Sequence, residues 1–155
     1  MAKKKTDLLE EIFRMRDEWR EQMSEALTLV KGKDLPWENN RHGRMKWYLH
    51  PALTDRAMRS LVVFVQEIPP LSHTGKQRLQ GGLVHYILEG RGYTVLNGVK
   101  HEWEAGDCVV FPILPNGVEY QHFNSDPERV VRFIAAQPNL FDLVGVDMGC
   151  GFEQL

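Results

Sequence analysis

The chain has 155 residues, of which 43% are hydrophobic and 26% charged, a size and composition that suit one folded domain with a single core. Its 19 lysines and arginines against 21 aspartates and glutamates give a net charge of −2, which argues against nucleic acid or an anionic membrane as partner. No apolar run approaches the length of a membrane span, and the opening residues lack the apolar core of a signal peptide. The two cysteines, Cys108 and Cys150, form no disulfide framework, so we expect a cytoplasmic protein.

Residues 7–31 show the pattern of one long amphipathic helix. Its apolar side chains recur at spacings of three and four and make one stripe on a charged surface: Leu8, Ile12, Met15, Trp19, Met23, Ala26 and Val30. Thr6 is the predicted N-cap, and Gly32 the residue that ends the helix. We expect the stripe to pack against the chain's own domain or against a second subunit in a homodimer.

Residues 34–58 have two prolines, the pair Asn39-Asn40 and little periodicity, which predicts a long loop that wraps the domain. Residues 1–58 are therefore taken as a helix and a wrapping loop.

Short strands follow at regular intervals. Residues 60–68 are rich in β-branched and aromatic side chains and end at Pro69-Pro70, which predicts a strand closed by a turn. Asn97-Gly98 is the dipeptide preferred in a two-residue type I′ hairpin turn. Further strands are predicted in the segments LVHYILEG, YTVL, VKHEWEAGD, CVVFP and RVVRFIAA. We therefore expect an all-β antiparallel sandwich or barrel over residues 59–137, with residues 138–155 as a tail that packs on the barrel or on a dimer partner.

Two segments resemble the paired motifs of the cupin family. The first is Gln77-Arg78-Leu79, then Leu83 and Gly90, at the places of the family's His-x-His pair, glutamate and glycine. The second keeps the family's turn residues and ends in a different side chain at its histidine; its members are Gly106, Asp107, Pro112, Gly117, Tyr120 and Asn124. The chain resembles small single-domain cupins of the gentisate-dioxygenase type. The resemblance implies a double-stranded β-helix, also called a jelly-roll barrel.

The same resemblance implies that the usual metal-ligand positions are substituted here. They fall on Gln77, Leu79, Leu83 and Tyr120. Divalent iron, manganese or zinc needs several nitrogen or oxygen donors. Leucine offers none, an amide carbonyl is weak, and a phenol binds well only as phenolate. We therefore expect no metal cofactor.

Strand alternation predicts which side chains line the barrel instead, because residues two apart share a face. The predicted catalytic residues are His85, His122 and Tyr120. The predicted substrate-binding residues are Gln77, Leu79, Leu83, Ile87 and His73, and an apolar wall with few polar groups is typical of a small-molecule pocket.

Three functions fit this lining. In the first, His85 and His122 act as acid and base on a small cyclic or aromatic metabolite, with Tyr120 as a donor, in an elimination, isomerisation, hydration or epimerisation. In the second, iron, manganese or zinc has moved to His85, His122 and Gln77, and the chemistry is like that of a dioxygenase. In the third, the barrel binds a small molecule without catalysis.

Overall fold

The computed structural model describes residues 7–140 and 153–154. One α-helix, α1 (Leu8–Ser24), and a 3-10 turn, η1 (Gly32–Asp34), precede the strands. The strands are β1 (Glu38–Asn40), β2 (Gly43–Leu49), β3 (Leu61–Ile68), β4 (Gln77–Leu79), β5 (Leu83–Glu89), β6 (Arg91–Leu96), β7 (Val99–Glu104), β8 (Cys108–Phe111), β9 (Val118–Asn124), β10 (Val131–Pro138) and β11 (Glu153–Gln154). The predicted all-β architecture with an N-terminal helix is confirmed.

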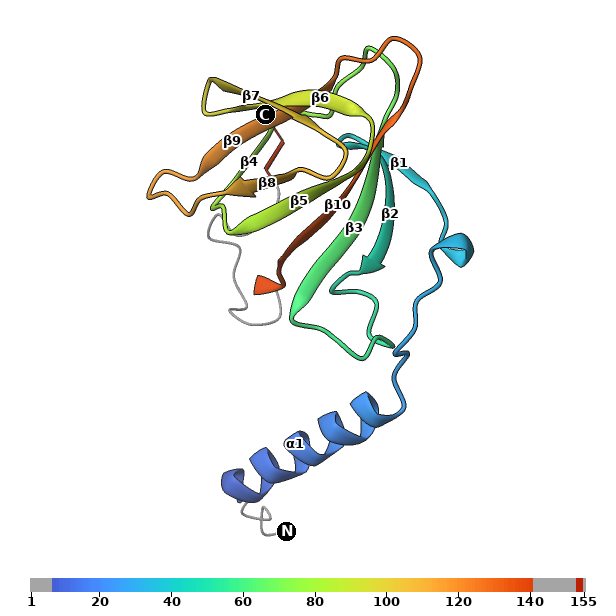
Figure 1. Ribbon diagram of the computed structural model, residues 1–155. Helices are drawn as coiled ribbons and strands as arrows, with labels where there is room; N and C mark the ends of the chain where they lie inside the picture. The colour runs from blue at the N-terminus through green and yellow to red at the C-terminus, as the bar shows by residue number, and fades with distance from the viewer. Residues whose placement is uncertain (1–6, 141–152, 155) are drawn as a thin grey trace.

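The strands form two antiparallel sheets that together make one barrel (Figure 1). One sheet has the order β1-β2-β3-β10-β5-β8 and the other the order β11-β4-β9-β6-β7. Strands far apart in sequence lie side by side, as β10 does between β3 and β5. The buried apolar side chains form two clusters, one that includes Phe64, Ile87 and Phe133 and one that includes Phe111 and Tyr120.

The predicted hairpin between β6 and β7 is confirmed by its backbone. Asn97 and Gly98 have φ angles of 47° and 83°, and both values are positive, as a type I′ turn requires. The hairpin places Thr94 opposite His101 and Gly92 opposite Trp103. This register determines which side chains of β6 and β7 reach the barrel centre.

The long loop predicted for residues 34–58 is wrong in part, because the segment contributes two strands. β1 and β2 form a hairpin, and β2 pairs with β3 so that Trp47 lies opposite Phe64. Most side chains of β2 are half-buried on both faces, which removes the apolar-polar alternation that reveals a strand. Lys46 and Arg44 each place a cationic group 4.6 Å from the ring centroid of Trp37, which further tethers the hairpin.

The helix is shorter than predicted and begins with a different cap. Asp7 is the N-cap, and its carboxylate accepts the backbone N–H groups of Leu9 at 3.1 Å and Glu10 at 3.4 Å, whereas Thr6 lies outside the described residues. The helix ends at Ser24 because Leu27 exchanges backbone hydrogen bonds with Asp55 and Ala57. That pairing draws the chain away from a helical path.

The apolar stripe of α1 is not buried against the chain's own barrel, so that half of the prediction is wrong for the described residues. Leu8 is 71% exposed and Trp19 47% exposed, and α1 extends away from the sheets (Figure 1). The guanidinium of Arg59 lies 4.8 Å from the ring centroid of Trp19. Packing against a second subunit stays a prediction.

Of the C-terminal tail, residues 141–152 and 155 lie outside the described residues. β11 pairs with β4, opposite Gln77 and Arg78. No helix in the described part of the chain combines the length and the apolar composition needed to traverse a bilayer.

Candidate functional site

Seven of the eight predicted site residues come together inside the barrel. Each is at most 5% exposed: Gln77, Leu79, Leu83, His85, Ile87, Tyr120 and His122. Buried and more exposed side chains alternate along β9 and along residues 83–88 of β5, which is why a period of two predicted these positions. His85 and His122 reach the same point from opposite sheets.

His73 is the exception, and its predicted inward direction is wrong. Its side chain is exposed, its ring packs against Phe123 with centroids 5.5 Å apart, and its Nδ1 lies 2.9 Å from Nε2 of Gln121. β4 spans only Gln77–Leu79, so strand alternation does not extend back to residue 73. Thr74 points inward instead, and its Oγ1 accepts the backbone N–H of His122 at 3.1 Å.

Four buried side chains form a continuous hydrogen-bonded row across the barrel. Trp103 donates its indole N–H to Oγ1 of Thr94 over 2.8 Å, and that oxygen lies 2.7 Å from Nδ1 of His122. Nε2 of His122 lies 2.7 Å from Nδ1 of His85. We call Trp103, Thr94, His122 and His85 the polar row.

Sequence reasoning missed Thr94 and Trp103. The signal was present in the hairpin register, because Thr94 lies opposite His122 in β9 and Gly92 lies opposite Trp103 in β7. Gly92 is needed there, since a Cβ at that position would lie 2.6 Å from Cη2 of Trp103 and 2.1 Å from the carbonyl oxygen of Phe123. A glycine within a strand often marks such a close approach.

Burial keeps both histidines neutral at pH 7. Desolvation lowers the pKa of His122 to about 3. The pKa of His85 is also lowered well below its usual value, first by burial and then by repulsion from His122. The pair therefore gives no imidazolium for general acid catalysis near neutral pH.

The last atom of the polar row has no partner. Nε2 of His85 is buried and makes no hydrogen bond within the described residues. Aromatic rings surround it: Phe111 and Phe133 lie 4.7 and 4.8 Å from the His85 ring, centroid to centroid, and Tyr120 lies 5.6 Å away. Buried side-chain nitrogens usually have a hydrogen-bond partner, so this atom marks the interior end of the row as a candidate contact point for a ligand.

Gln77 and Tyr120 form a second, closed polar contact. The Tyr120 hydroxyl donates to Oε1 of Gln77 over 2.7 Å, and the two residues face each other in the β4–β9 register. Burial raises the pKa of Tyr120, so the phenol stays protonated. Its hydroxyl hydrogen is therefore already used inside the protein.

The sequence was compared with protein-family models and with curated proteins. No protein-family model matches the chain. A curated relative, 5-aminosalicylate 1,2-dioxygenase of a Comamonas species, is 28% identical over 91 residues, which are 59% of this chain and 24% of that protein. The chain thus spans about a quarter of the length of the curated relative it matches.

Solved structures agree on the fold. The polyketide cyclase RemF of Streptomyces resistomycificus is similar with a TM-score of 0.60 and 19% identity, over 73% of this chain and 80% of that one. A cupin-like protein of Thermotoga maritima gives a TM-score of 0.54 and 15% identity, over 83% of this chain and 88% of that one. The chain has the cupin fold. The predicted double-stranded β-helix is therefore confirmed.

The residues at the cupin ligand positions do not fit a metal. Leu79 and Leu83 offer no donor, Oε1 of Gln77 accepts the hydroxyl hydrogen of Tyr120, and the phenol is protonated. The described residues hold no cluster of three or more histidine, cysteine, aspartate or glutamate side chains placed for a metal. Both ring nitrogens of His122 are engaged in the polar row, so a site relocated to the histidines would have one free imidazole nitrogen, on His85.

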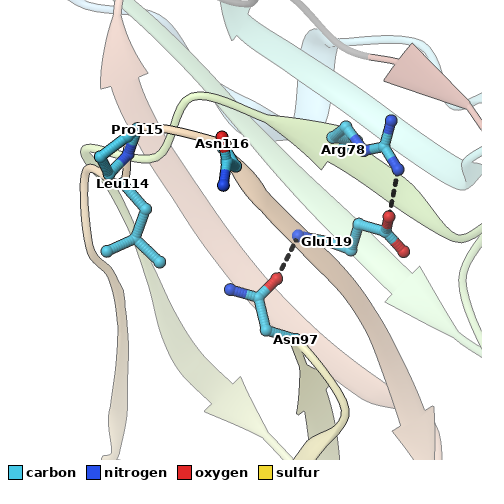
Figure 2. A pocket seen from close by; sticks show the side chains of 7 residues that line it. Arg78, Asn97, Leu114, Pro115, Asn116 and Glu119 are labelled. Atoms are coloured by element: carbon cyan, nitrogen blue, oxygen red, sulfur yellow. Dashed lines mark hydrogen bonds and ion pairs between the residues drawn. The ribbon is translucent and has the colours of Figure 1, made fainter.

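A hollow of about 460 Å³ on the outer surface of the cupin barrel is unrelated to these groups (Figure 2). Its lining includes Arg78, Asn97 and Glu119. Arg78 pairs with the Glu119 carboxylate, and Oδ1 of Asn97 accepts the Glu119 backbone N–H at 2.8 Å. These polar groups satisfy one another, so the candidate site is the interior one.

Proposed function

We propose that this chain is a cupin-fold enzyme that acts on a small cyclic or aromatic organic molecule without a metal, with His85 as the polar group that contacts the substrate. The observation that carries the proposal is the buried, unpartnered Nε2 atom of His85. A buried polar atom without a hydrogen bond costs about 1–3 kcal/mol. A buried polar atom of this kind calls for an explanation, and contact with a ligand or a role in a reaction is the one that we propose here.

The surroundings of His85 support the substrate class. Phe111, Phe133 and Tyr120 present ring faces and edges to the imidazole, and Leu79 and Leu83 add aliphatic surface in the same interior. An apolar wall around one directed polar group is the usual build of a small-molecule site. A flat ring that carries one polar substituent matches this lining.

The three predicted catalytic residues take different roles in this proposal. His85 contacts the substrate, because its Nε2 is the free atom. His122 acts through His85, since its own nitrogens bind Thr94 and His85. Tyr120 shapes the wall and orders Gln77, because its hydroxyl hydrogen is already donated. One fixed hydrogen-bond donor in a dry site stabilises negative charge that develops on a carbonyl oxygen. This suits an isomerisation or elimination in which a basic atom of the substrate itself takes up the proton that leaves the carbon next to the carbonyl.

The second candidate function is ring oxidation, favoured by the similarity to 5-aminosalicylate 1,2-dioxygenase. Both candidates share an aromatic or cyclic substrate and differ in the need for a metal. In a third, the barrel binds the same class of molecule and does not transform it.

A paired binding and turnover experiment tests the proposal. Aromatic and alicyclic carbonyl compounds are screened by thermal shift against the wild type, His85→Phe and the control His101→Phe, whose position is exposed on β7. Binding compounds are then incubated with enzyme in chelator, and products are followed by NMR. We expect binding by the wild type and His101→Phe, loss with His85→Phe, and conversion in chelator.

Each contrary result points to a different candidate. Binding that survives His85→Phe removes His85 from the site. Conversion that stops in chelator and returns with ferrous iron supports the oxygenase. Binding by the wild type without any product, with or without metal and oxygen, leaves a binding protein.

A further inference from the structure

We propose that Trp103 and Thr94 are positioning residues that fix the proton arrangement of the two histidines, so that His85 offers an N–H donor to an oxygen atom of the substrate. The substrate part rests on the proposed function, whereas the proton arrangement is a property of the protein alone.

Trp103 fixes one end of the polar row. An indole nitrogen can only donate, and Nε1 of Trp103 lies 2.8 Å from Oγ1 of Thr94. The Thr94 oxygen must therefore accept this bond. Both side chains are buried, at 6% and 0% exposure, so water does not compete for the contact.

Thr94 determines which ring nitrogen of His122 carries the hydrogen. Its hydroxyl has one hydrogen, and the described residues offer that hydrogen one acceptor, Nδ1 of His122 at 2.7 Å. If Thr94 donates, Nδ1 of His122 is bare and its hydrogen lies on Nε2. That hydrogen points to Nδ1 of His85, 2.7 Å away, so the hydrogen of His85 lies on Nε2.

The reverse arrangement leaves more polar groups without partners. If Nδ1 of His122 donated to Thr94, the buried Thr94 hydroxyl hydrogen would have no acceptor within the described residues. His85 would then donate from Nδ1 to His122, and its bare Nε2 would also be unpaired. The first arrangement leaves one unpaired group and the second leaves two. Each unpaired group is costly in a dry interior, so the first arrangement is favoured.

Both arrangements require neutral histidine rings, and burial keeps the two rings neutral. Desolvation lowers the pKa of both histidines, that of His122 to about 3. At pH 7 each ring therefore has one N–H and one bare nitrogen, and the row runs in a single direction from Trp103 to His85.

The direction of the hydrogen bonds in the polar row determines which kind of substrate atom can bind to His85. Nε2 of His85 carries a hydrogen, and its only lone pair in the ring plane, on Nδ1, is used by His122. The ring can then donate to a carbonyl, enolate or phenolate oxygen, and it cannot abstract a proton. A neutral imidazole N–H polarises a carbonyl oxygen while keeping its proton. The substrate class is thus a ring compound with an acceptor oxygen at the point that meets His85.

The proton arrangement is tested on the free wild-type protein by two-bond ¹H–¹⁵N NMR, which identifies the protonated nitrogen of each ring. We expect His85 and His122 both protonated at Nε2. His85 protonated at Nδ1 overturns the inference, whatever the protein binds. Thr94→Val should weaken this preference in both rings, and Thr94→Ser, which keeps the hydroxyl, should restore it. An unchanged NMR pattern in a folded Thr94→Val protein overturns the role of Thr94, and the same result in Trp103→Phe overturns that of Trp103.

The substrate part is tested with a matched pair of neutral probes, acetophenone and 2-phenylpropene, which have the same shape and differ in a carbonyl oxygen against a methylene group. We expect the first to bind, to shift the His85 Nε2–H resonance, and to lose about tenfold in affinity in Thr94→Val. Equal binding of both probes overturns the oxygen preference. If neither probe nor any compound of the screen binds while both rings carry Nε2–H, the proposed function fails and the proton arrangement stands.

Discussion

Tyr120 donates its hydroxyl hydrogen to Oε1 of Gln77 over 2.7 Å, and the two residues also face each other in neighbouring strands. In the cupin motifs these are positions of metal-binding histidines. Here the two side chains are bonded to each other and buried, at 1% and 2% exposure. Two of the four cupin ligand positions are therefore occupied by a neutral pair whose members bind each other, and the other two by leucines.

The first prediction concerns metal content. Protein purified without chelator should hold well below one equivalent of iron, manganese or zinc by elemental analysis, because the leucines and the Gln77–Tyr120 pair supply no open donor set. The triple variant Gln77→His, Leu79→His and Tyr120→His should gain affinity for these metals. Stoichiometric metal in the wild type, or no gain in a folded triple variant, contradicts this account.

The second prediction concerns the energy of the Gln77–Tyr120 contact. Tyr120→Phe leaves Oε1 of Gln77 buried without its donor, so we expect a loss of about 1–3 kcal/mol in the free energy of unfolding. Gln77→Leu should cost a similar amount. The double variant should lose clearly less than the sum, because both partners are then apolar. Strict additivity in urea unfolding would show that the two groups do not interact.

The third prediction is a pH dependence of stability. Burial lowers the pKa of His122 from 6.5 to about 3, so the unfolded chain binds a proton that the folded protein does not. Stability should therefore be complete above pH 6.5 and fall as the pH drops toward 3. Each such histidine contributes a slope of about 1.4 kcal/mol per pH unit. Urea unfolding across this range should show a smaller slope in His122→Asn, with the exposed His101→Asn as control. Equal slopes in all three proteins would contradict the burial argument.

Much of the fold and of the site follows from period-two alternation. His85 and His122 were found because burial alternates along β9 and along residues 83–88 of β5. The partners of these histidines were not predicted. Thr94 follows the alternation of β6, whereas Trp103 lies on a strand whose other side chains are all exposed, so no alternation marks it. His73 failed for the opposite reason, since alternation was extended beyond the three-residue strand β4. Local patterns thus predict strands whose burial alternates, but they miss half-buried strands such as β2 and single inward side chains such as Trp103.

The fourth prediction concerns α1. None of its side chains is buried, so Trp19→Ala should change the unfolding free energy of the barrel by less than about 0.5 kcal/mol. If the exposed stripe pairs two copies, as predicted from the sequence, the same variant should weaken the dimer in sedimentation experiments. Deletion of residues 1–31 should then give a folded monomer. Glu21→Ala, outside the stripe, is the control. A wild type that is monomeric at high concentration contradicts the homodimer.

The hairpin of β1 and β2 also determines how the six-stranded sheet ends. An exposed edge strand offers unpaired backbone groups to which a second chain can add, and short polar edge strands prevent this. β1 is such a strand, with only Glu38, Asn39 and Asn40. Without it the edge would be the longer β2, which carries Met45 and Trp47. β1 therefore protects the edge of the sheet from pairing with the edge strand of a second chain. Its removal would lower the concentration at which the protein stays in solution.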